Sequence, residues 1–184
     1  MQIILQPVLV ALDYSTLQSL ANDVSKEFKN TKVAVGSSLN ESEAETVFQS
    51  DYDRNRNQWN SPELLRSLME KFNPDTDMKI LFIFDADAYS YGLNFVFGEA
   101  IGHGSIAIIY LPRIKQEFYG LKSDEQLFYE RLVKESVHEL GHTFGLAHCN
   151  STRCVMHFSN SLHDTDIKKR SFCDSCNRKW TSHG

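Results

Sequence analysis

Hydrophobic and polar positions change their spacing along the chain and predict strands and helices in alternation. Residues 3–12 form an apolar run that predicts a strand, and residues 31–35 predict a second one. Between them, apolar residues recur every three or four positions over residues 15–29, which predicts an amphipathic helix with Ser15 as its N-cap. Residues 36–61 are too charged for a core, so we expect a surface loop there.

A second helix and two buried strands are expected after this loop. Ser61 and Pro62 predict the start of a helix that runs to about Phe72, with Ser61 as its cap and Pro62 at the first helical position. Residues 80–84 and 105–111 are continuous apolar runs. Such runs are typical of strands that are buried on both faces of a sheet.

An edge strand over residues 94–100 and a long helix that begins near residue 123 complete the expected elements. Their order implies an α/β fold with a mixed sheet, against which the long helix packs. Residues 146–184 hold little apolar material. We therefore expect residues 1–145 to form an α/β subdomain. Residues 146–184 should form a small subdomain that depends on bound zinc to hold it together.

Composition and charge exclude several classes of protein. The 184 residues are 41% hydrophobic and 23% charged, as in an ordinary globular domain. A net charge of -5 argues against nucleic acid as a partner, because binding to phosphates needs a basic face. No apolar run approaches the roughly 20 residues that span a bilayer, and no secretory signal is visible. We expect a cytoplasmic monomer with reduced thiols and no membrane partner.

The segment HELGHTFGLAH, residues 138–148, carries the candidate chemistry. His138 and His142 are four residues apart, so on a helix both rings lie on one face and can reach one metal ion. Gly145 lets the chain leave the helix and fold back with a third imidazole, His148. Three nitrogen ligands leave a fourth position for water, with Glu139 beside it. This is the arrangement of an open zinc site.

The four cysteines follow this motif in two close pairs. Cys149 is next to His148, Cys154 follows five residues later, and Cys173 and Cys176 form a CxxC. Four thiols in this spacing are the composition of a closed, tetrahedral zinc site. Two disulfides are one alternative, and a thioredoxin-like redox pair is another. Because Cys149 adjoins His148, a metal bound by the cysteines should fix where the third imidazole points.

Together these residues resemble the signature of the archaemetzincins, a family within the metzincin zinc peptidases. The likeness lies in residues 138–149, in Cys154 with Val155 and Met156, and in CDSC at residues 173–176. The segment LNFVFGEA, residues 93–100, is also similar to an archaemetzincin segment. The resemblance implies a metzincin-like fold with a twisted mixed sheet, a backing helix and an active-site helix. It also implies that the edge strand lies beside the zinc cleft and pairs with an extended substrate.

The resemblance further implies two zinc ions and a role for each motif residue. His138, His142 and His148 would bind a catalytic zinc, and Glu139 would be the general base. The four cysteines would bind a second, structural zinc. Met156 would be the methionine of the Met-turn, whose side chain forms an apolar floor beneath the catalytic metal.

The expected reaction is the hydrolysis of peptide or protein substrates by a metal-bound water. Zinc held by three neutral imidazoles retains its charge, so a bound water becomes acidic enough to supply hydroxide near pH 7. Glu139 would take the proton and pass it to the leaving nitrogen. No tyrosine follows Met156 to assist the oxyanion, and His157 is either a substitute donor or a packing residue. The sequence leaves open whether the peptidase acts on chain ends or internally.

Two other functions compete with the peptidase. A zinc-containing module with little or no turnover would bind extended peptides at the edge strand. A purely structural or zinc-storage protein would need no substrate cleft above the three histidines. Cobalt and manganese are alternative metals for the histidine site.

Overall fold

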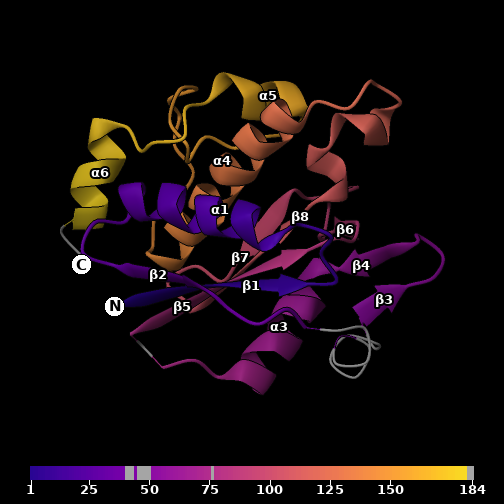
Figure 1. Ribbon diagram of the computed structural model, residues 1–184, viewed down its shortest axis with the longest axis horizontal. Coiled ribbons are helices and arrows are strands. Elements are labelled where there is room, and N and C mark those ends of the chain that lie inside the picture. Colours follow the sequence, from indigo (N-terminus) through magenta and orange to yellow (C-terminus); the bar gives the residue numbers. More distant parts are fainter. Residues whose placement is uncertain (40–43, 45–50, 76, 182–184) are drawn as a thin grey trace.

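A five-stranded sheet forms the centre of the protein (Figure 1). The structure is a computed structural model that describes residues 1–39, 44, 51–75 and 77–181. The strands lie in the order β2-β1-β5-β8-β7. Their bounds are Gln2–Val8 (β1), Lys32–Val35 (β2), Met78–Phe84 (β5), Gly98–Ala100 (β7) and Ile106–Tyr110 (β8). Four strands are parallel and β7 is antiparallel at one edge, so the predicted mixed sheet is confirmed.

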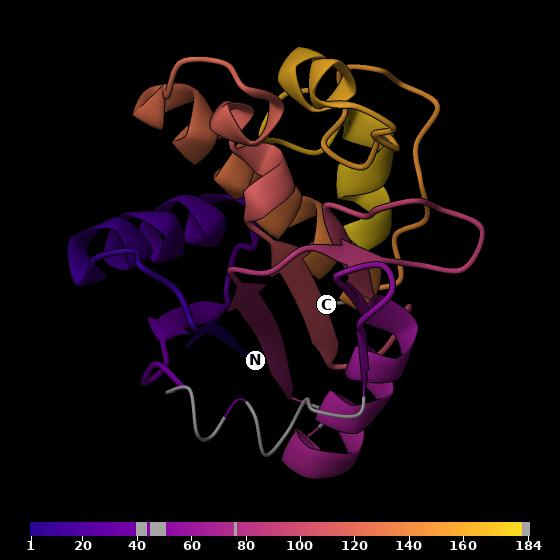
Figure 2. The same ribbon diagram turned by 90° about the vertical axis from the view of Figure 1, so that its right-hand side faces the viewer.

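Helices cover both faces of this sheet (Figure 1, Figure 2). Helices α1 (Tyr14–Glu27) and α4 (Glu125–Thr143) lie on one face, and α3 (Ser61–Phe72) lies on the other. Alternate side chains of β5 therefore enter two separate cores. Leu81 and Ile83 pack with α1 and α4, whereas Phe82 and Phe84 pack with α3. The prediction that this apolar run is buried on both faces is confirmed.

Two helix caps differ from the sequence prediction. Helix α1 begins at Tyr14, and the side chain of Asp13 caps it by accepting a 2.7 Å hydrogen bond from the backbone N–H of Thr16. Ser15 instead donates to Asp13, because a carboxylate is the stronger acceptor for the free N–H groups of a helix end. Ser61 is the first residue of α3 rather than its cap, and its hydroxyl accepts a 2.8 Å hydrogen bond from Tyr110.

The segment predicted as a surface loop contributes two strands to a small second sheet. Strands β3 (Tyr52–Asp53) and β4 (Gln58–Asn60) form a hairpin, and β4 pairs in parallel with β6 (Ala88–Tyr89). The loop prediction was therefore wrong for these residues, because the partner strand β6 is distant in sequence and supplies the missing hydrogen bonds. Residues 40–43 and 45–50 of the predicted loop lie outside the described residues.

Two predicted strands are shorter in the structure than in the sequence analysis. Strand β1 ends at Val8, because Leu9 has a φ of 53° and this left-handed conformation breaks an extended strand. The predicted edge strand is reduced to β7, although the backbone N–H of Tyr110 still donates a 2.8 Å hydrogen bond to the carbonyl of Phe97. The edge position itself is confirmed, since β7 is the last strand of the sheet.

The C-terminal segment packs on α1 and α4. Two short 3₁₀ helices, η2 (Pro112–Ile114) and η3 (Gln116–Tyr119), precede α4, and helices α5 (Leu162–Ile167) and α6 (Asp174–Thr181) follow it. Val155, Met156 and Trp180 belong to the same core as the buried side chains of α1 and α4. The division of the chain after residue 145 stays a prediction. None of the described helices is long and apolar enough to cross a membrane.

Arg170 joins this C-terminal segment to both helices. Its guanidinium donates two hydrogen bonds of 2.6 and 2.8 Å to Glu130 on α4, and a third of 2.8 Å to Asp23 on α1. The hydrogen bonds from Arg170 lower the pKa of Glu130 below its usual value. The ion pair therefore stabilises the fold fully at neutral pH, and this contribution is lost as the pH falls through the lowered pKa.

Replacing Arg170 by methionine should lower the free energy of unfolding by about 1 kcal/mol at neutral pH, since the pair is partly exposed. The difference between variant and parent should shrink below a pH of about 4.5, as Glu130 takes up a proton. Urea denaturation of variant and parent over a range of pH measures this difference in the free energy of unfolding. Lys26→Met, which removes a highly exposed partner of Asp23, is the control with a smaller effect. An equal difference at every pH would show that Arg170 acts through packing alone.

Candidate metal centre

Helix α4 carries the first two histidines and the glutamate of the motif. His138, Glu139 and His142 lie in its last two turns, and the four-residue spacing puts both rings on one face. His138 and Glu139 are buried, with 4% and 5% of their surface exposed, and His142 is half-buried. The helix ends at Thr143, close to the predicted exit at Gly145.

A tight turn after α4 brings the third histidine back. Gly145 has a φ of 82°, a left-handed conformation that glycine adopts without strain. The backbone N–H of Leu146 then donates a 3.0 Å hydrogen bond to the carbonyl of Gly141, which closes the turn. The ring of His148 lies 5.4 Å from that of His138 and 4.8 Å from that of His142, measured between centroids. The structure therefore brings together the three imidazoles that the sequence singled out.

Backbone carbonyls orient two of these rings. Nδ1 of His138 lies 2.7 Å from the carbonyl of Val155, and Nδ1 of His142 lies 2.7 Å from the carbonyl of Leu146. A carbonyl only accepts, so both Nδ1 atoms must carry the proton and each neutral ring has its lone pair on Nε2. The two Nε2 atoms lie 3.1 Å apart. Nitrogens that share a tetrahedral zinc at about 2.05 Å would lie about 3.3 Å apart, so the spacing fits this metal.

Burial sets the charge of the site. It lowers the pKa of His142 to about 4 and lowers the pKa of His138 and His148 as well, so all three rings are neutral at pH 7 and able to bind a cation. Burial, together with the nearby charge of Glu135, raises the pKa of Glu139 well above its usual value. A carboxylate of this kind is a better proton acceptor than an exposed one.

The three histidines and Glu139 form one wall of a cavity of about 490 Å³. The segment from Gly92 to Ala100, which includes β7, also lines this cavity, and so do residues 158–160. The predicted edge strand thus lies at the cavity. Phe158 also contacts His148, with 4.9 Å between the ring centroids. A space of this size can hold part of a peptide chain.

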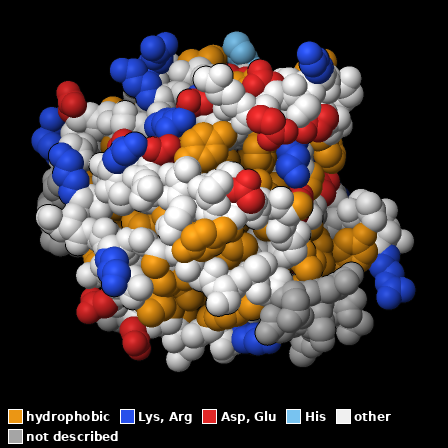
Figure 3. All heavy atoms as spheres, in the orientation of Figure 1, with side chains coloured by type: hydrophobic (Ala, Val, Ile, Leu, Met, Phe, Trp, Pro, Cys, Tyr) orange, Lys and Arg blue, Asp and Glu red, His pale blue; other side chains and the backbone are white. Residues whose placement is uncertain are grey.

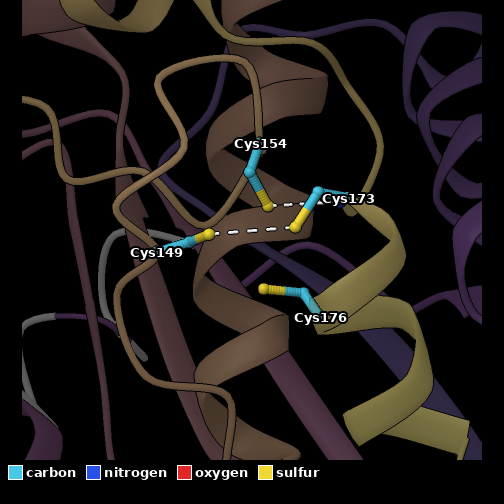
Figure 4. Close-up of side chains that lie close together, drawn as sticks. All are labelled: Cys149, Cys154, Cys173 and Cys176. Atoms are coloured by element: carbon cyan, nitrogen blue, oxygen red, sulfur yellow. Dashed lines mark hydrogen bonds between the residues drawn. The ribbon is translucent and has the colours of Figure 1, made fainter.

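The four cysteines meet in a second cluster (Figure 4). Cys149 and Cys154 come from the loop after α4, Cys173 directly precedes α6, and Cys176 lies in its first turn. Their sulfur atoms point toward a common centre. All four are free thiols, and Sγ of Cys149 lies 3.8 Å from Sγ of Cys173. Sulfurs that share a tetrahedral zinc at about 2.3 Å would lie about 3.8 Å apart, whereas a disulfide is about 2.0 Å long. The donors and their spacing fit a metal rather than two disulfides.

A three-residue segment connects the two clusters. Cys154 belongs to the cysteine cluster, the carbonyl of Val155 accepts the hydrogen bond from His138, and the carbonyl of Met156 accepts a 2.8 Å hydrogen bond from the backbone N–H of Cys149. Met156 is fully buried, and a Cβ on Gly141 would lie 2.5 Å from its Sδ. The side chain of Met156 therefore lies directly against the helix that carries two of the histidines.

One further candidate from the sequence, His157, does not line the cavity. Nδ1 of His157 lies 3.0 Å from the carbonyl of Cys149, so this ring supports the loop that holds Cys149 and Cys154. His157 is absent from the cavity wall described above. The sequence analysis did not single out Glu135, Phe158 or, within the predicted edge strand, Gly98, all of which line the cavity. Glu135 precedes Glu139 by one helical turn, so helical spacing could have found it. Gly98 and Phe158 reach the site only through tertiary packing.

Comparisons with known proteins show the family of this chain. The sequence profile of Peptidase family M54 matches residues 16–182. An archaemetzincin from Thermococcus kodakarensis is 43% identical over 151 residues, which cover 82% of this chain and 79% of that protein. The crystal structure of archaemetzincin from Archaeoglobus fulgidus has a TM-score of 0.77 and 36% identity, and covers 97% of this chain and 99% of that one. The structure from Methanopyrus kandleri has a TM-score of 0.81 and 32% identity, with 100% and 94% covered.

Gly141→Ala should destabilise the protein despite a favourable helix propensity. Alanine gains about 1 kcal/mol over glycine in a helix. The added Cβ would overlap the buried Sδ of Met156, and overpacking of this kind costs about 1–3 kcal/mol. The net loss of up to about 2 kcal/mol is measured by urea denaturation.

The control for this prediction is the same substitution in a Met156→Ala background. There the overlap is gone and only the helix propensity remains, so Gly141→Ala should be neutral or stabilising. Equal destabilisation in both backgrounds would contradict a direct contact between Gly141 and Met156.

Proposed function

The chain belongs to the archaemetzincins, peptidase family M54, and from this membership we propose that it hydrolyses peptide bonds with Glu139 as the general base. Membership makes it a zinc metallopeptidase, whose substrates are peptides or proteins. The single observation that carries the proposal is the convergence of three neutral imidazoles beside a buried glutamate in one cavity.

We propose His138, His142 and His148 as the residues that hold the catalytic zinc. The hydrogen bonds from Nδ1 of His138 and His142 fix each ring and direct Nε2 to a common point, which supports this assignment. When bound, zinc supplies a Lewis acid that polarises a carbonyl and makes water more acidic. The three histidines would hold the metal at the cavity that they line.

Glu139 would move the proton during the reaction. Its raised pKa allows it to take a proton from the attacking water, and its place in the cavity wall lets it deliver that proton to the leaving nitrogen. The edge strand β7 would hold the substrate. Strand β7 pairs with β8 on one side only, so its other side offers backbone groups to an extended peptide.

We propose a structural zinc at the four cysteines. This metal would hold residues 146–184 in place against the rest of the chain. It would also fix the position of His148, which directly precedes Cys149. The site needs no open position, because its four thiolates complete a tetrahedron.

The proposed partners are limited to peptides and proteins. On the face in Figure 3, Lys and Arg side chains are interspersed with Asp and Glu side chains, which supports the expectation that nucleic acid is not a partner. That the protein acts as a monomer stays a prediction.

The zinc-loaded protein should cleave members of a broad peptide library, and Glu139→Gln should lower kcat by about 10²–10⁴-fold while the zinc content stays unchanged. Mass spectrometry of the digest and metal analysis measure both quantities. Glu125→Gln, on the first turn of the same helix, is the control and should keep the parent rate. Peptides that bind but are never cut by the loaded parent would instead indicate a binding module.

Cys173→Ser should remove the zinc of the cysteine site and also reduce occupancy of the histidine site, since Cys149 and Met156 would no longer be held in place. We expect less than one zinc per chain and a lower thermal midpoint. Ser175→Ala, between the two cysteines of the CxxC, is the matched control. A content of one full zinc per chain in Cys173→Ser would show that the two sites are independent.

A further inference from the structure

The carboxylate of Glu139 is held in place by packing rather than by hydrogen bonds. No hydrogen bond or ion pair joins its side chain to another residue that the structure describes. A flexible side chain in such a setting has several rotamers available unless its neighbours exclude them. Some neighbour must therefore fix the direction in which this carboxylate points.

Gly98 of β7 is that neighbour. A Cβ built on Gly98 would lie 2.5 Å from Cγ and 2.7 Å from Oε1 of Glu139. On its other side the same Cβ would lie 2.7 Å from the backbone carbonyl oxygen of Ile108 in β8. Real Cβ atoms do not approach other atoms this closely. Glu139 thus occupies the space that a side chain at position 98 would need.

The backbone conformation of Gly98 does not by itself require glycine. Among the glycines that the structure describes, Gly92, Gly120 and Gly145 have a positive φ, so Gly98 has a conformation that other residues adopt. An edge strand would also favour a residue with a side chain, because glycine weakens strands. The requirement at position 98 is therefore one of space, and Glu139 and the Ile108 carbonyl define that space.

We propose that Gly98 is a positioning residue for Glu139, and that its missing side chain lets the edge strand set the direction of the proton-accepting carboxylate. This inference rests on the proposed function of Glu139. It also joins two roles in one strand, because a peptide that pairs with β7 would lie at a fixed distance from the base that β7 positions. A side chain at position 98 would move the carboxylate and leave the three histidines where they are.

Gly98→Ala should lower kcat by about 100-fold with little change in KM or zinc content, since a displacement of about 1 Å can cost this much. Gly102→Ala is the matched control, because an added Cβ there meets no atom within 4 Å. A rise in KM at constant kcat would overturn the proposal and assign Gly98 to substrate binding. An unchanged kcat would overturn it as well.

A double-mutant cycle separates this proposal from the role of Glu139 itself. In a Glu139→Gln background the base is already lost, so Gly98→Ala should change the residual rate by less than about threefold. A further 100-fold loss in that background would show that Gly98 acts on something other than Glu139. Full activity of Glu139→Gln alone would refute the proposed function instead, so the two failures are distinguishable.

A second double-mutant cycle measures thermal stability, so it does not require an active enzyme. Gly98→Ala should lower the thermal midpoint, and Glu139→Ala, which removes Cγ and the carboxylate, should restore most of the loss in the double variant. An equal loss in both backgrounds would assign the clash to the Ile108 carbonyl and overturn the proposal. This outcome is measurable even in a variant that is inactive.

Discussion

The candidate site depends on three consecutive residues, Cys154, Val155 and Met156, because they fix three groups at once. Cys154 lies in the thiol cluster, the Val155 carbonyl orients His138, and the Met156 carbonyl holds the backbone of Cys149. His148 is bonded directly to Cys149, so its position follows from the last of these contacts. A shift of this segment would therefore disturb the cysteine cluster and the histidine cluster together.

Two glycines let neighbouring side chains approach the backbone closely, and these contacts build the rest of the site around α4. Gly141 allows the buried Met156 to lie against the helix on one side, and Gly98 allows the edge strand to approach Glu139 on another. Both contacts depend on the absence of a Cβ. The helix is thus confined between Gly98 at the sheet edge and Met156 after Cys154.

Local pattern predicted the elements better than it predicted their ends. The apolar runs of β5 and β8 and the long helix α4 are where the sequence indicates, because burial on both faces and helical spacing are visible over a few residues. The caps at Ser15 and Ser61 were wrong, since a neighbouring acceptor or a distant tyrosine competes for each hydroxyl. The small sheet of β3, β4 and β6 was missed because β6 comes about thirty residues after β4.

The sequence by itself determined the family and which side chains gather in the two clusters, because their spacing on a helix and in a CxxC is a local property. Tertiary structure alone decided which carbonyl orients His138, that the two clusters share a connecting segment, and that a glycine of the sheet edge touches Glu139. The contacts of His138 with Val155 and of Gly98 with Glu139 join residues 17 and 41 positions apart. Their geometry follows from packing of the sheet, α4 and the loop that holds Cys149 and Cys154, which no short pattern encodes.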